Sequence, residues 1–418
     1  MHEPSAASLT RHRSFVLFWC ARTFINGAFM MQGVAVGWQI YALTDDPFDL
    51  GLVGLVQFVP LLALAVVIGQ VADLFDRRVV IATCQAGKAL AALALALGTA
   101  QGWLGRDAML AILLVSGTAR AFEIPTVHAL LPGIVPATLL PRAIAASASA
   151  QQTAVICGPS LGGLLYTTLG ATAVYVVCAA VFLAAGVVIA MVQLAPHAEV
   201  KEADKTDERR PLSLETLFAG FRYIRGHPIL LGAISLDLFA VLLGGVTALL
   251  PIYARDILQG GPWALGLLRS APAVGALATS IVLARRAIAG RAGAIMFAAV
   301  GAFGIASLMF ALSTSMALSF LALAVYGASD AVSVVIRQSL VQMRTPYAML
   351  GRVMAVNSMC TGSSGSLGEF RAGTVAAWIG AVPSALIGGL GAIAVMLIWM
   401  RAFPALRRVD KLAPEAAP

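Results

Sequence analysis

The sequence predicts an all-α membrane protein with twelve transmembrane helices in two pseudo-symmetric bundles of six. Of its 418 residues, 60% are hydrophobic and only 11% are charged, which is the composition of a membrane protein. The apolar stretches are about 20 to 28 residues long, and roughly 20 helical residues cross the hydrocarbon core of a bilayer. No ten-residue stretch alternates between polar and apolar residues, so we expect helices rather than the strands of a porin.

Each expected helix is an apolar stretch bounded by polar or charged residues. The first follows Arg11 and Arg13 but is too long for the core of a signal peptide, and no small-residue cleavage site follows it, so we expect a retained helix. The expected spans are, in order, Ser14 to Leu43, Leu50 to Ala72, Val79 to Ala100, Ala108 to Leu130, Ala143 to Thr168, Ala171 to Leu194, Ile229 to Tyr253, Ala264 to Leu283, Ala292 to Leu312, Ala317 to Leu340, Val353 to Ile379 and Val382 to Met400.

The distribution of positive charge predicts how these helices are oriented. If the N-terminus is cytoplasmic, most of the 28 Lys and Arg residues fall in cytoplasmic loops, and only Arg106 and Arg255 fall in outer loops. Because cytoplasmic loops are enriched in Lys and Arg, we expect a multi-pass protein of the bacterial cytoplasmic (inner) membrane with both termini in the cytoplasm. This topology accounts for the net charge of +8, so nucleic-acid binding is not expected.

One long polar loop divides the predicted helices into two sets. We expect an N-terminal bundle at 1–195, a cytoplasmic loop at 196–228, and a C-terminal bundle with a short cytoplasmic tail at 229–418. The second part of the loop, from Leu214 to Arg225, has apolar residues at helical spacing. It could form a helix on the membrane surface, and a solvated linker explains it equally well.

The two halves resemble each other at an offset of 210 residues, the separation of Pro136 and Pro346. PATLLPRAIAAS from Pro136 aligns with PYAMLGRVMAVN from Pro346. The same offset superposes Gly117 on Gly327, Gly158 on Gly368, Gly163 on Gly373 and Gly170 on Gly380. Two homologous six-helix bundles joined by a long loop are typical of secondary transporters, which hold their substrate near the midplane between the halves.

Three local patterns make the chain resemble the major facilitator superfamily over essentially its whole length. The first, GQVADLFDRR after the second span, is similar to the cytoplasmic gate motif G-x-x-x-D-R-x-G-R-R of that family. The matching residues are Gly69, Asp73, Arg77 and Arg78. The resemblance implies that the glycine lets two helices approach closely and that the aspartate latches the gate by accepting hydrogen bonds from a helix N-terminus. Leu74 and Asp76 replace the Arg and Gly of the family, so we expect an altered latch.

The second pattern, AVICGPSLGG in the fifth span, is similar to the antiporter motif G-x-x-x-G-P-x-x-G-G of the family, with Ala154 in place of the first glycine. Its remaining members are Gly158, Pro159, Gly162 and Gly163. The glycines would form a smooth packing face and the proline would kink the helix; the motif implies export. The third pattern, RQSLVQMRTPYAMLGRVMAVNSM, resembles the branch that includes enterobactin exporters and macrolide-efflux-like proteins.

Ionisable residues inside the spans are the candidates for proton coupling. Each charge near the bilayer centre costs roughly 3 kcal/mol on insertion scales, so it should be paired or face water. The expected proton carriers, in order, are Asp330, Asp237, Glu123 and Glu369. Their expected charge partners are Arg120, Arg22 and Arg371. Static ion pairs between helices are the alternative explanation for each carboxylate.

Spacing and the repeat suggest how some of these charges are placed. Arg120 and Glu123 are three residues apart and could pair on one helix face. Under the offset Arg120 falls on Asp330, so these opposite charges could face each other across a central cavity. Arg337 lies near the cytoplasmic end of its span and Arg269 near the outer end, so we expect both to extend towards the headgroups.

Uncharged polar residues complete the expected substrate cavity. The candidates are Asn26, Gln32, Gln57, Gln338 and Asn357. Each could equally form a hydrogen bond between helices. We expect no metal and no cofactor, because the five cysteines form no C-x-x-C, the histidines form no H-E-x-x-H, and the phosphate-binding pattern G-x-x-x-x-G-K-[ST] is absent.

These features favour a monomeric, proton-coupled exporter of a small amphipathic molecule, such as a siderophore or a drug, that works by alternating access. Its expected partners are this small molecule, the proton and the lipid bilayer. An importer of a small nutrient and a transporter-like sensor that binds ligand without flux are the alternatives. An ATP-driven pump and a membrane-embedded enzyme would need motifs that this sequence lacks.

Overall fold

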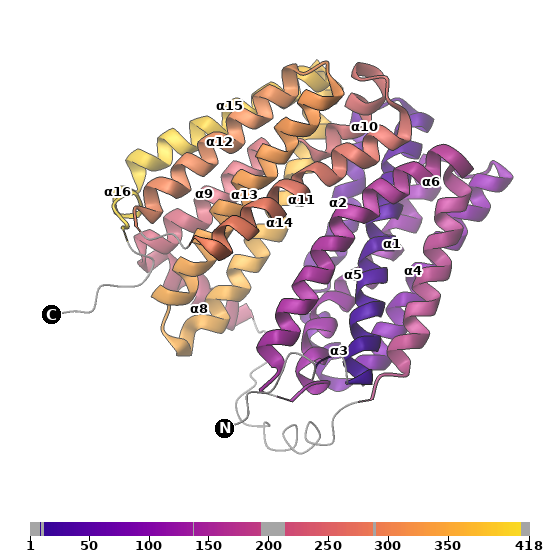
Figure 1. The fold of residues 1–418 in the computed structure, drawn as a ribbon, viewed down its shortest axis with the longest axis horizontal. Coiled ribbons are helices and arrows are strands. Elements are labelled where there is room, and N and C mark those ends of the chain that lie inside the picture. The colour runs from indigo at the N-terminus through magenta and orange to yellow at the C-terminus, as the bar shows by residue number, and fades with distance from the viewer. Residues whose placement is uncertain (1–8, 10–11, 137, 194–213, 287–289, 411–418) are drawn as a thin grey trace. The chain divides into compact units, whose positions relative to one another are not determined.

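A computed structural model describes residues 9, 12–136, 138–193, 214–286 and 290–410 (Figure 1). Every regular element in these ranges is a helix, so the predicted all-α class is confirmed. Nine of the described helices are long and apolar enough to cross a membrane, and Pro47–Ala63 is apolar but shorter. The chain is therefore a multi-pass membrane protein.

The first six predicted spans correspond to helices α1 to α6. Their bounds are α1 Arg13–Thr44, α2 Pro47–Ala63, α3 Ala65–Leu74, α4 Arg77–Gln101, α5 Arg106–Leu130 and α6 Leu140–Ala190, with a 3-10 turn at Leu131–Gly133. The second span is divided into α2 and α3 at Leu64, where the backbone departs from helical geometry with φ −106° and ψ 10°. α6 contains both the fifth and the sixth span, and Gly170 breaks its helical backbone between them.

The last six predicted spans correspond to the helices from α9 to α15. The bounds in this part are α8 Leu214–Gly226, α9 Pro228–Gly244, α10 Leu250–Ile252, α11 Gly261–Arg285, α12 Ala292–Leu312, α13 Met316–Arg344, α14 Tyr347–Ile379, α15 Ala381–Ala402 and α16 Pro404–Arg407. The seventh span is broken after α9, where Gly245 has an extended backbone. α14 is not among the nine apolar helices, because serines, glycines and charged residues lower its hydropathy.

The chain forms two compact units. The first consists of residues 1–39 and 56–211, and the second consists of residues 40–55 and 212–418. The sequence places residues 40–55 in the N-terminal bundle, whereas in the structure they pack with the second unit. Gly51 shows why, since a Cβ atom there would lie 2.9 Å from the carbonyl oxygen of Phe370 on α14. The missing side chain lets the start of α2 approach α14 closely.

Equivalent glycines make equivalent contacts in the two units, as the internal repeat predicts. Gly117 on α5 lies against the backbone of α2, and Gly327 on α13 lies against the backbone of α11. Gly158 on α6 lies against α1, and Gly368 on α14 lies against α9. In both halves, therefore, the fourth predicted span packs on the second and the fifth packs on the first.

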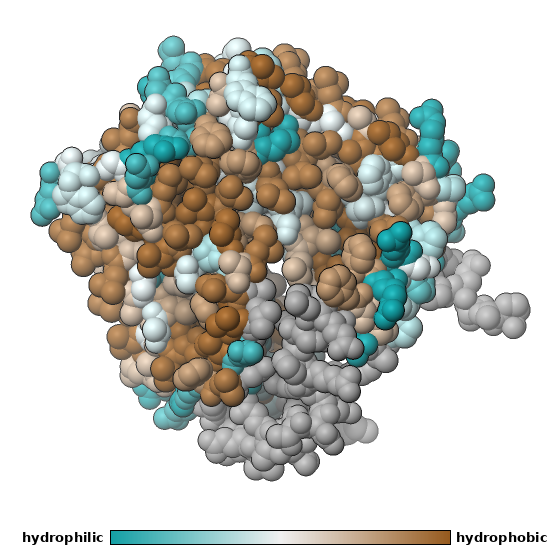
Figure 2. Space-filling view, turned by 180° about the vertical axis from the view of Figure 1, so that it is seen from behind, coloured by the Kyte–Doolittle hydropathy of each residue, from teal (hydrophilic) through white to brown (hydrophobic). Residues whose placement is uncertain are grey.

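Hydrophobic side chains cover much of the surface, as expected for a protein surrounded by lipid (Figure 2). α4 shows the arrangement within one helix. Leu90, Leu93 and Leu97 are exposed, whereas Lys88 of the same helix has no exposed surface. Lys88 thus faces the interior of the first unit, where its charge needs a partner.

The predicted helix in the central loop is present as α8. Its residue Gly220 lies against the backbone of Arg352 on α14, and Ile224 is buried in a hydrophobic cluster that includes Leu230. Phe218 and Phe221, on another face of α8, are exposed. α8 therefore docks on the second unit and presents aromatic rings outward; the loop at 194–213 lies outside the described residues.

Gly170 and Gly380 occupy equivalent turns of the repeat and adopt a backbone conformation that is essentially restricted to glycine, with φ 80° and ψ 174° at the first and φ 93° and ψ 162° at the second. We expect Gly170→Ala and Gly380→Ala each to destabilise the protein by about 1–3 kcal/mol. The measurement is the unfolding temperature of the purified variants. Gly362→Ala is the control, because a Cβ atom there meets nothing within 4 Å. Unfolding temperatures of all three variants equal to that of the original protein would contradict the prediction.

Candidate functional site

A buried ion pair joins Asp237 on α9 to Arg337 on α13. Arg337 Nη2 lies 3.1 Å from Asp237 Oδ2, and the two side chains are 1% and 4% exposed. Arg337 Nη1 also donates hydrogen bonds to Asn357 Oδ1 at 2.6 Å and to Thr361 Oγ1 at 2.7 Å, both on α14. One guanidinium therefore connects three helices of the second unit, and its hydrogen bonds offset the cost of burying the charge.

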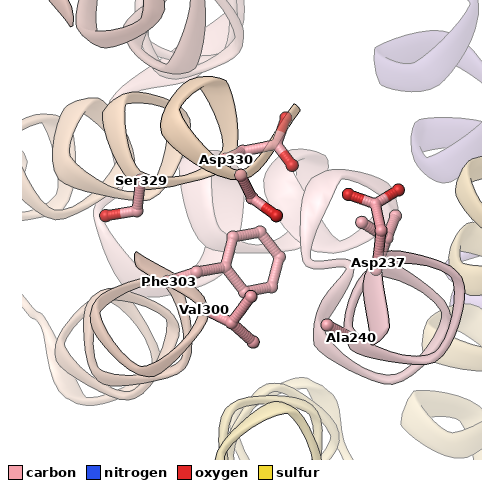
Figure 3. A pocket seen from close by; sticks show the side chains of 8 residues that line it. Asp237, Ala240, Val300, Phe303, Ser329 and Asp330 are labelled. Carbon is pink, nitrogen blue, oxygen red and sulfur yellow. The ribbon is translucent and has the colours of Figure 1, made fainter. Parts of the chain in front are cut away.

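A second carboxylate faces the same region. Asp330 and Asp237 line one small cavity of about 10 Å³, which is room for about one water molecule, together with the ring of Phe303 (Figure 3). Asp330 forms no ion pair within 4 Å in the described part of the chain, whereas Asp237 is paired with Arg337. We call Asp237, Asp330 and Arg337 the carboxylate cluster. It holds two carboxylates and one guanidinium, so it carries an excess negative charge unless one carboxylate is protonated.

The expectation that the side chain of Arg337 extends towards the headgroups is wrong. Its side chain is buried and turns towards Asp237 on the neighbouring helix instead of extending to the headgroups. Asp330 and Arg337 are seven residues apart, which is close to two helical turns, so both lie on one face of α13. The depth of Arg337 within its span did not reveal that this face packs against α9.

A second buried ion pair lies in the first unit. Lys88 Nζ on α4 lies 2.6 Å from Glu123 Oε2 on α5, and the two side chains are 0% and 8% exposed. The sequence suggested Arg120 as the partner of Glu123, but the guanidinium of Arg120 lies over the ring of Phe29, 3.7 Å from its centre. The neighbouring helix supplies the cation, which spacing along α5 alone could not show.

Two arginines border a larger cavity in the first unit, of about 100 Å³. Its polar lining comes from α1, α5 and α6 and consists of Arg22, Asn26, Arg120, Glu123, His128 and Gln151; we call these residues the basic pocket. Arg22 Nη2 donates a hydrogen bond to Gln151 Oε1 at 3.1 Å, and Asn26 Nδ2 donates to the carbonyl oxygen of Arg22 at 2.9 Å. The structure thus brings together four residues that the sequence singled out.

Glu369 and Arg371 make separate contacts in the second unit. Glu369 Oε1 accepts a hydrogen bond from Thr247 Oγ1 at 3.0 Å, and a Cβ atom on Gly54 would lie 2.6 Å from Glu369 Oε2. Arg371 Nη2 donates to the carbonyl oxygen of Gly245 at 3.5 Å. Glu369 is therefore hydrogen-bonded to a hydroxyl group, and its side chain packs against α2 at Gly54.

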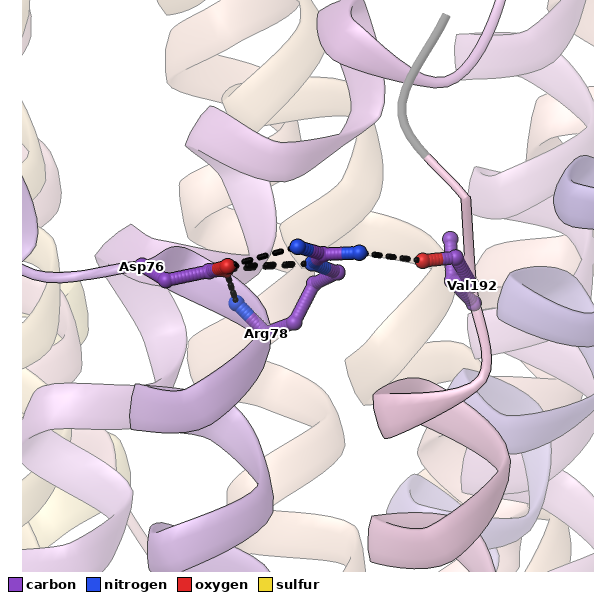
Figure 4. A network of polar contacts seen from close by, with 3 residues as sticks. All are labelled: Asp76, Arg78 and Val192. Atoms are coloured by element: carbon purple, nitrogen blue, oxygen red, sulfur yellow. Dashed lines mark hydrogen bonds and ion pairs between the residues drawn. The ribbon is translucent and has the colours of Figure 1, made fainter.

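The gate motif lies between α3 and α4. Asp76, which replaces the usual glycine, caps α4 by accepting a hydrogen bond from the backbone N–H of Arg78 at 2.8 Å, and the guanidinium of Arg78 lies 2.7 Å from the same carboxylate (Figure 4). Arg78 also donates to the carbonyl oxygen of Val192 after α6, and Arg77 donates to the carbonyl oxygen of Ala129 on α5. The surroundings of Gly69 and the side chain of Asp73 lie outside the described part.

Replacing Asp76 is expected to weaken this corner of the first unit. The hydrogen bonds from Arg78 hold the pKa of Asp76 below its ordinary value. Because the pKa is lower in the folded than in the unfolded protein, the carboxylate stabilises the fold above the unfolded pKa of about 4, and this contribution disappears as the pH falls through the folded pKa. We expect Asp76→Ala to cost about 1 kcal/mol through the lost cap, measured by thermal unfolding at neutral pH.

Asp107→Ala serves as the control for this prediction, because the Asp107 side chain is 90% exposed at the start of α5. If both variants unfold at the same temperature as the original protein, Asp76 does not act as a stabilising cap.

The antiporter motif forms a helix contact, as its small residues suggest. A Cβ atom on Gly158 would lie 2.9 Å from the carbonyl oxygen of Gly27, and one on Gly162 would lie 2.8 Å from the Cα atom of Met31. Both partners are on α1. Pro159 and Gly163 are also buried, so this face of α6 packs closely against α1 within the first unit.

The uncharged polar candidates do not form one group. Asn357 bonds to Arg337, and Asn26 borders the basic pocket. Gln32 is buried and its Oε1 has no hydrogen-bond partner, the backbone of Gln57 contacts Gly117, and Gln338 is exposed. Within the described ranges, no three His, Cys, Asp or Glu side chains are placed to hold a metal ion.

Three residues with clear roles in these clusters were not selected from the sequence. They are Lys88, Arg337 and Thr361. The seven-residue spacing of Asp330 and Arg337 is a signal that would have placed the two charges on one face. Lys88 lies in a predicted span, so its charge indicates that it needs a partner. Because it is 35 positions from Glu123, no spacing along one helix indicates that these two residues pair.

The chain matches the family model described as transmembrane secretion effector over residues 4–417. It is 26% identical over 415 residues to the enterobactin exporter EntS of Escherichia coli O1:K1, covering 97% of this chain and 96% of that protein. It is 27% identical over 420 residues to the enterobactin exporter EntS of Citrobacter koseri, covering 98% and 97%.

Solved transporter structures share the fold. The nucleoside transporter NupG superposes with a TM-score of 0.70 at 16% identity, over 93% of this chain and 99% of that one. A bacterial homologue of the iron transporter ferroportin superposes with a TM-score of 0.67 at 16% identity, over 94% and 99%. At these identities the likeness concerns the fold.

Proposed function

Since the chain belongs to the transmembrane secretion effector family of the major facilitator superfamily, we propose that it is a proton-coupled exporter of a small amphipathic molecule. The family and the curated relatives are transporters, so the chain is a membrane transporter and not an enzyme.

The carboxylate cluster is the single observation that supports proton coupling. Asp237 and Asp330 share a cavity large enough for about one water, and Arg337 forms an ion pair with Asp237 but not with Asp330 among the described residues. Two carboxylates that share an enclosed space do not ionise independently, so whether one of them holds a proton depends on the charge of the other. If Arg337 moves relative to the two carboxylates during the transport cycle, the affinity for that proton changes. The proton would then be bound in one conformational state of the transporter and released in another.

The similar proteins support the direction of transport and the class of substrate. Both relatives described above are named enterobactin exporters. We therefore propose export of a siderophore or a drug-like molecule from the cytoplasm. The packing of Gly158 and Gly162 on α1 is consistent with the antiporter motif that implies this direction. We further propose a monomer in the bacterial inner membrane with both termini cytoplasmic, on the strength of the positive charge in the expected cytoplasmic loops.

A flux assay in everted membrane vesicles tests the proposal. A proton gradient is established, a panel of siderophores and antibiotics is added, and release of the gradient is followed with a pH-sensitive dye. A compound exported by the protein should collapse part of the gradient and accumulate in vesicles that contain the protein, but not in vesicles without it. Accumulation that is unaffected when an ionophore abolishes the gradient would contradict proton coupling. Saturable binding without accumulation would favour the sensor.

A further inference from the structure

We propose that the basic pocket binds an oxyanion group of the transported molecule, a carboxylate or a deprotonated phenol, between Arg22 and Arg120. The inference rests on the proposed function in one respect, namely that the anion belongs to the substrate. The pocket itself is defined within the first unit, on α1, α5 and α6. It is separate from the carboxylate cluster, which lies within the second unit.

The charges around the basic pocket do not balance. Glu123 is the carboxylate of the lining, and Lys88 already lies 2.6 Å from it. Arg22 and Arg120 remain, and neither forms an ion pair within 4 Å in the part of the chain that the structure describes. Guanidinium groups stay protonated in proteins, so the pocket keeps two positive charges that no carboxylate of its lining balances. A bound anion would offset them.

The hydrogen-bonding groups of the two arginines are also incompletely used. Arg22 is 9% exposed, and its Nε atom is buried with no hydrogen-bond partner, although Nη2 bonds to Gln151. The guanidinium of Arg120 lies over the face of the Phe29 ring, and that contact uses none of its N–H groups. A guanidinium presents its N–H groups as a planar fork that fits the two oxygens of a carboxylate. Such an oxyanion would accept a hydrogen bond from the buried Nε atom of Arg22, which otherwise has no partner.

The size and the walls of the pocket limit the ligand. A volume of about 100 Å³ holds a carboxylate or a phenolate ring edge, but not a whole drug-sized molecule. Phe18, Ile25 and Ile124 supply apolar lining beside the polar groups. The pocket therefore suits the charged end of an amphipathic molecule whose remainder lies outside it. An anionic lipid headgroup offers similar chemistry, and the experiment must separate the two sources.

Equilibrium binding to the full-length protein in phosphatidylcholine nanodiscs tests the inference. The probe is salicylate, which carries a carboxylate beside a phenol, and salicylamide is its neutral counterpart. Salicylate should bind and salicylamide should not. Arg22→Gln and Arg120→Gln should each weaken salicylate binding by roughly tenfold or more, since each removes a buried charge from the anion. Arg401→Gln, at an exposed position at the end of α15, is the matched control and should bind normally.

Further measurements keep the inference falsifiable if a glutamine variant fails to fold. Arg22→Lys and Arg120→Lys keep the charge but lose the planar fork, so they should bind salicylate with intermediate affinity. Equal binding of salicylate and salicylamide to the original protein would overturn the inference, and so would normal binding by both folded glutamine variants. Loss of salicylate binding in nanodiscs that contain phosphatidylglycerol would assign the pocket to a lipid headgroup instead and would overturn the assignment to substrate.

The outcome is distinguishable from failure of the proposed proton coupling, because binding is measured without a gradient. Asp330→Asn should bind salicylate like the original protein. Weak binding by the arginine variants together with gradient-independent flux in the original protein would leave the anion site standing and refute the coupling. The reverse result would refute the anion site alone.

Discussion

Arg337→Gln is expected to destabilise the protein by about 3–5 kcal/mol, because it leaves the carboxylate of Asp237 buried without its cation. The same change removes hydrogen bonds to Asn357 and Thr361, so contacts of α13 with both α9 and α14 are weakened. The measurement is the free energy of unfolding in detergent, from denaturant titration. We also expect loss of transport, since the variant disrupts the geometry of the carboxylate cluster.

A double variant separates an unpaired charge from a general packing defect. Arg337→Gln combined with Asp237→Asn removes both charges of the ion pair, so it should recover part of the lost stability. Arg401→Gln removes an exposed arginine from the same unit and should stay within about 0.5 kcal/mol of the original protein. A single variant Arg337→Gln as stable as this control would show that the ion pair makes no net contribution.

Asp330→Asn is expected to abolish the dependence of transport on the pH gradient while leaving the fold intact. Asp330 faces the cavity that it shares with Asp237, and it has no cation of its own within 4 Å among the described residues. Asparagine has nearly the same shape as aspartic acid, so little packing is lost, but it cannot release a proton. Substrate flux in everted vesicles should become equal with and without a gradient, and accumulation against a concentration gradient should cease.

Asp107→Asn is the matched control for this prediction, because it makes the same substitution at an exposed site. It should keep gradient-driven accumulation. If Asp330→Asn transports with an unchanged dependence on the pH gradient, Asp330 does not carry the coupled proton. The same assay on Asp237→Asn then distinguishes a static ion pair from a second proton site, since a static pair would lower stability without altering the pH dependence of the remaining flux.

The carboxylate cluster shows how far the sequence could lead to the site. Asp330 and Asp237 were selected because an ionisable side chain in an apolar span must be matched, and both face one cavity. The partner was not found in the same way. Arg337 was assigned to the membrane surface from its depth in the span, yet it is buried against Asp237. Depth follows from sequence position, whereas the direction of a side chain depends on the helix packed beside it.

In the first unit, too, the buried carboxylate could be predicted from the sequence but its cation could not. Glu123 was correctly treated as a buried charge, but its partner Lys88 is 35 positions away along the chain. A spacing of three residues on one helix suggested Arg120, because the rule for neighbours on a helix is local. Contacts between helices depend on the rotation of each helix about its axis, and apolar helices with hydrophobic residues on every side provide little information about that rotation.

By itself, the sequence determined the all-α membrane class, because the length and apolarity of a stretch decide whether it can satisfy its own backbone within a bilayer. It also placed Gly170 and Gly380 at equivalent positions of the repeat, each between two expected spans, and the structure shows that both adopt a backbone conformation restricted to glycine. Only the tertiary structure decided which buried charges pair. Ion pairs form between side chains of adjacent helices, and that adjacency is set by packing over the whole unit rather than by any one segment.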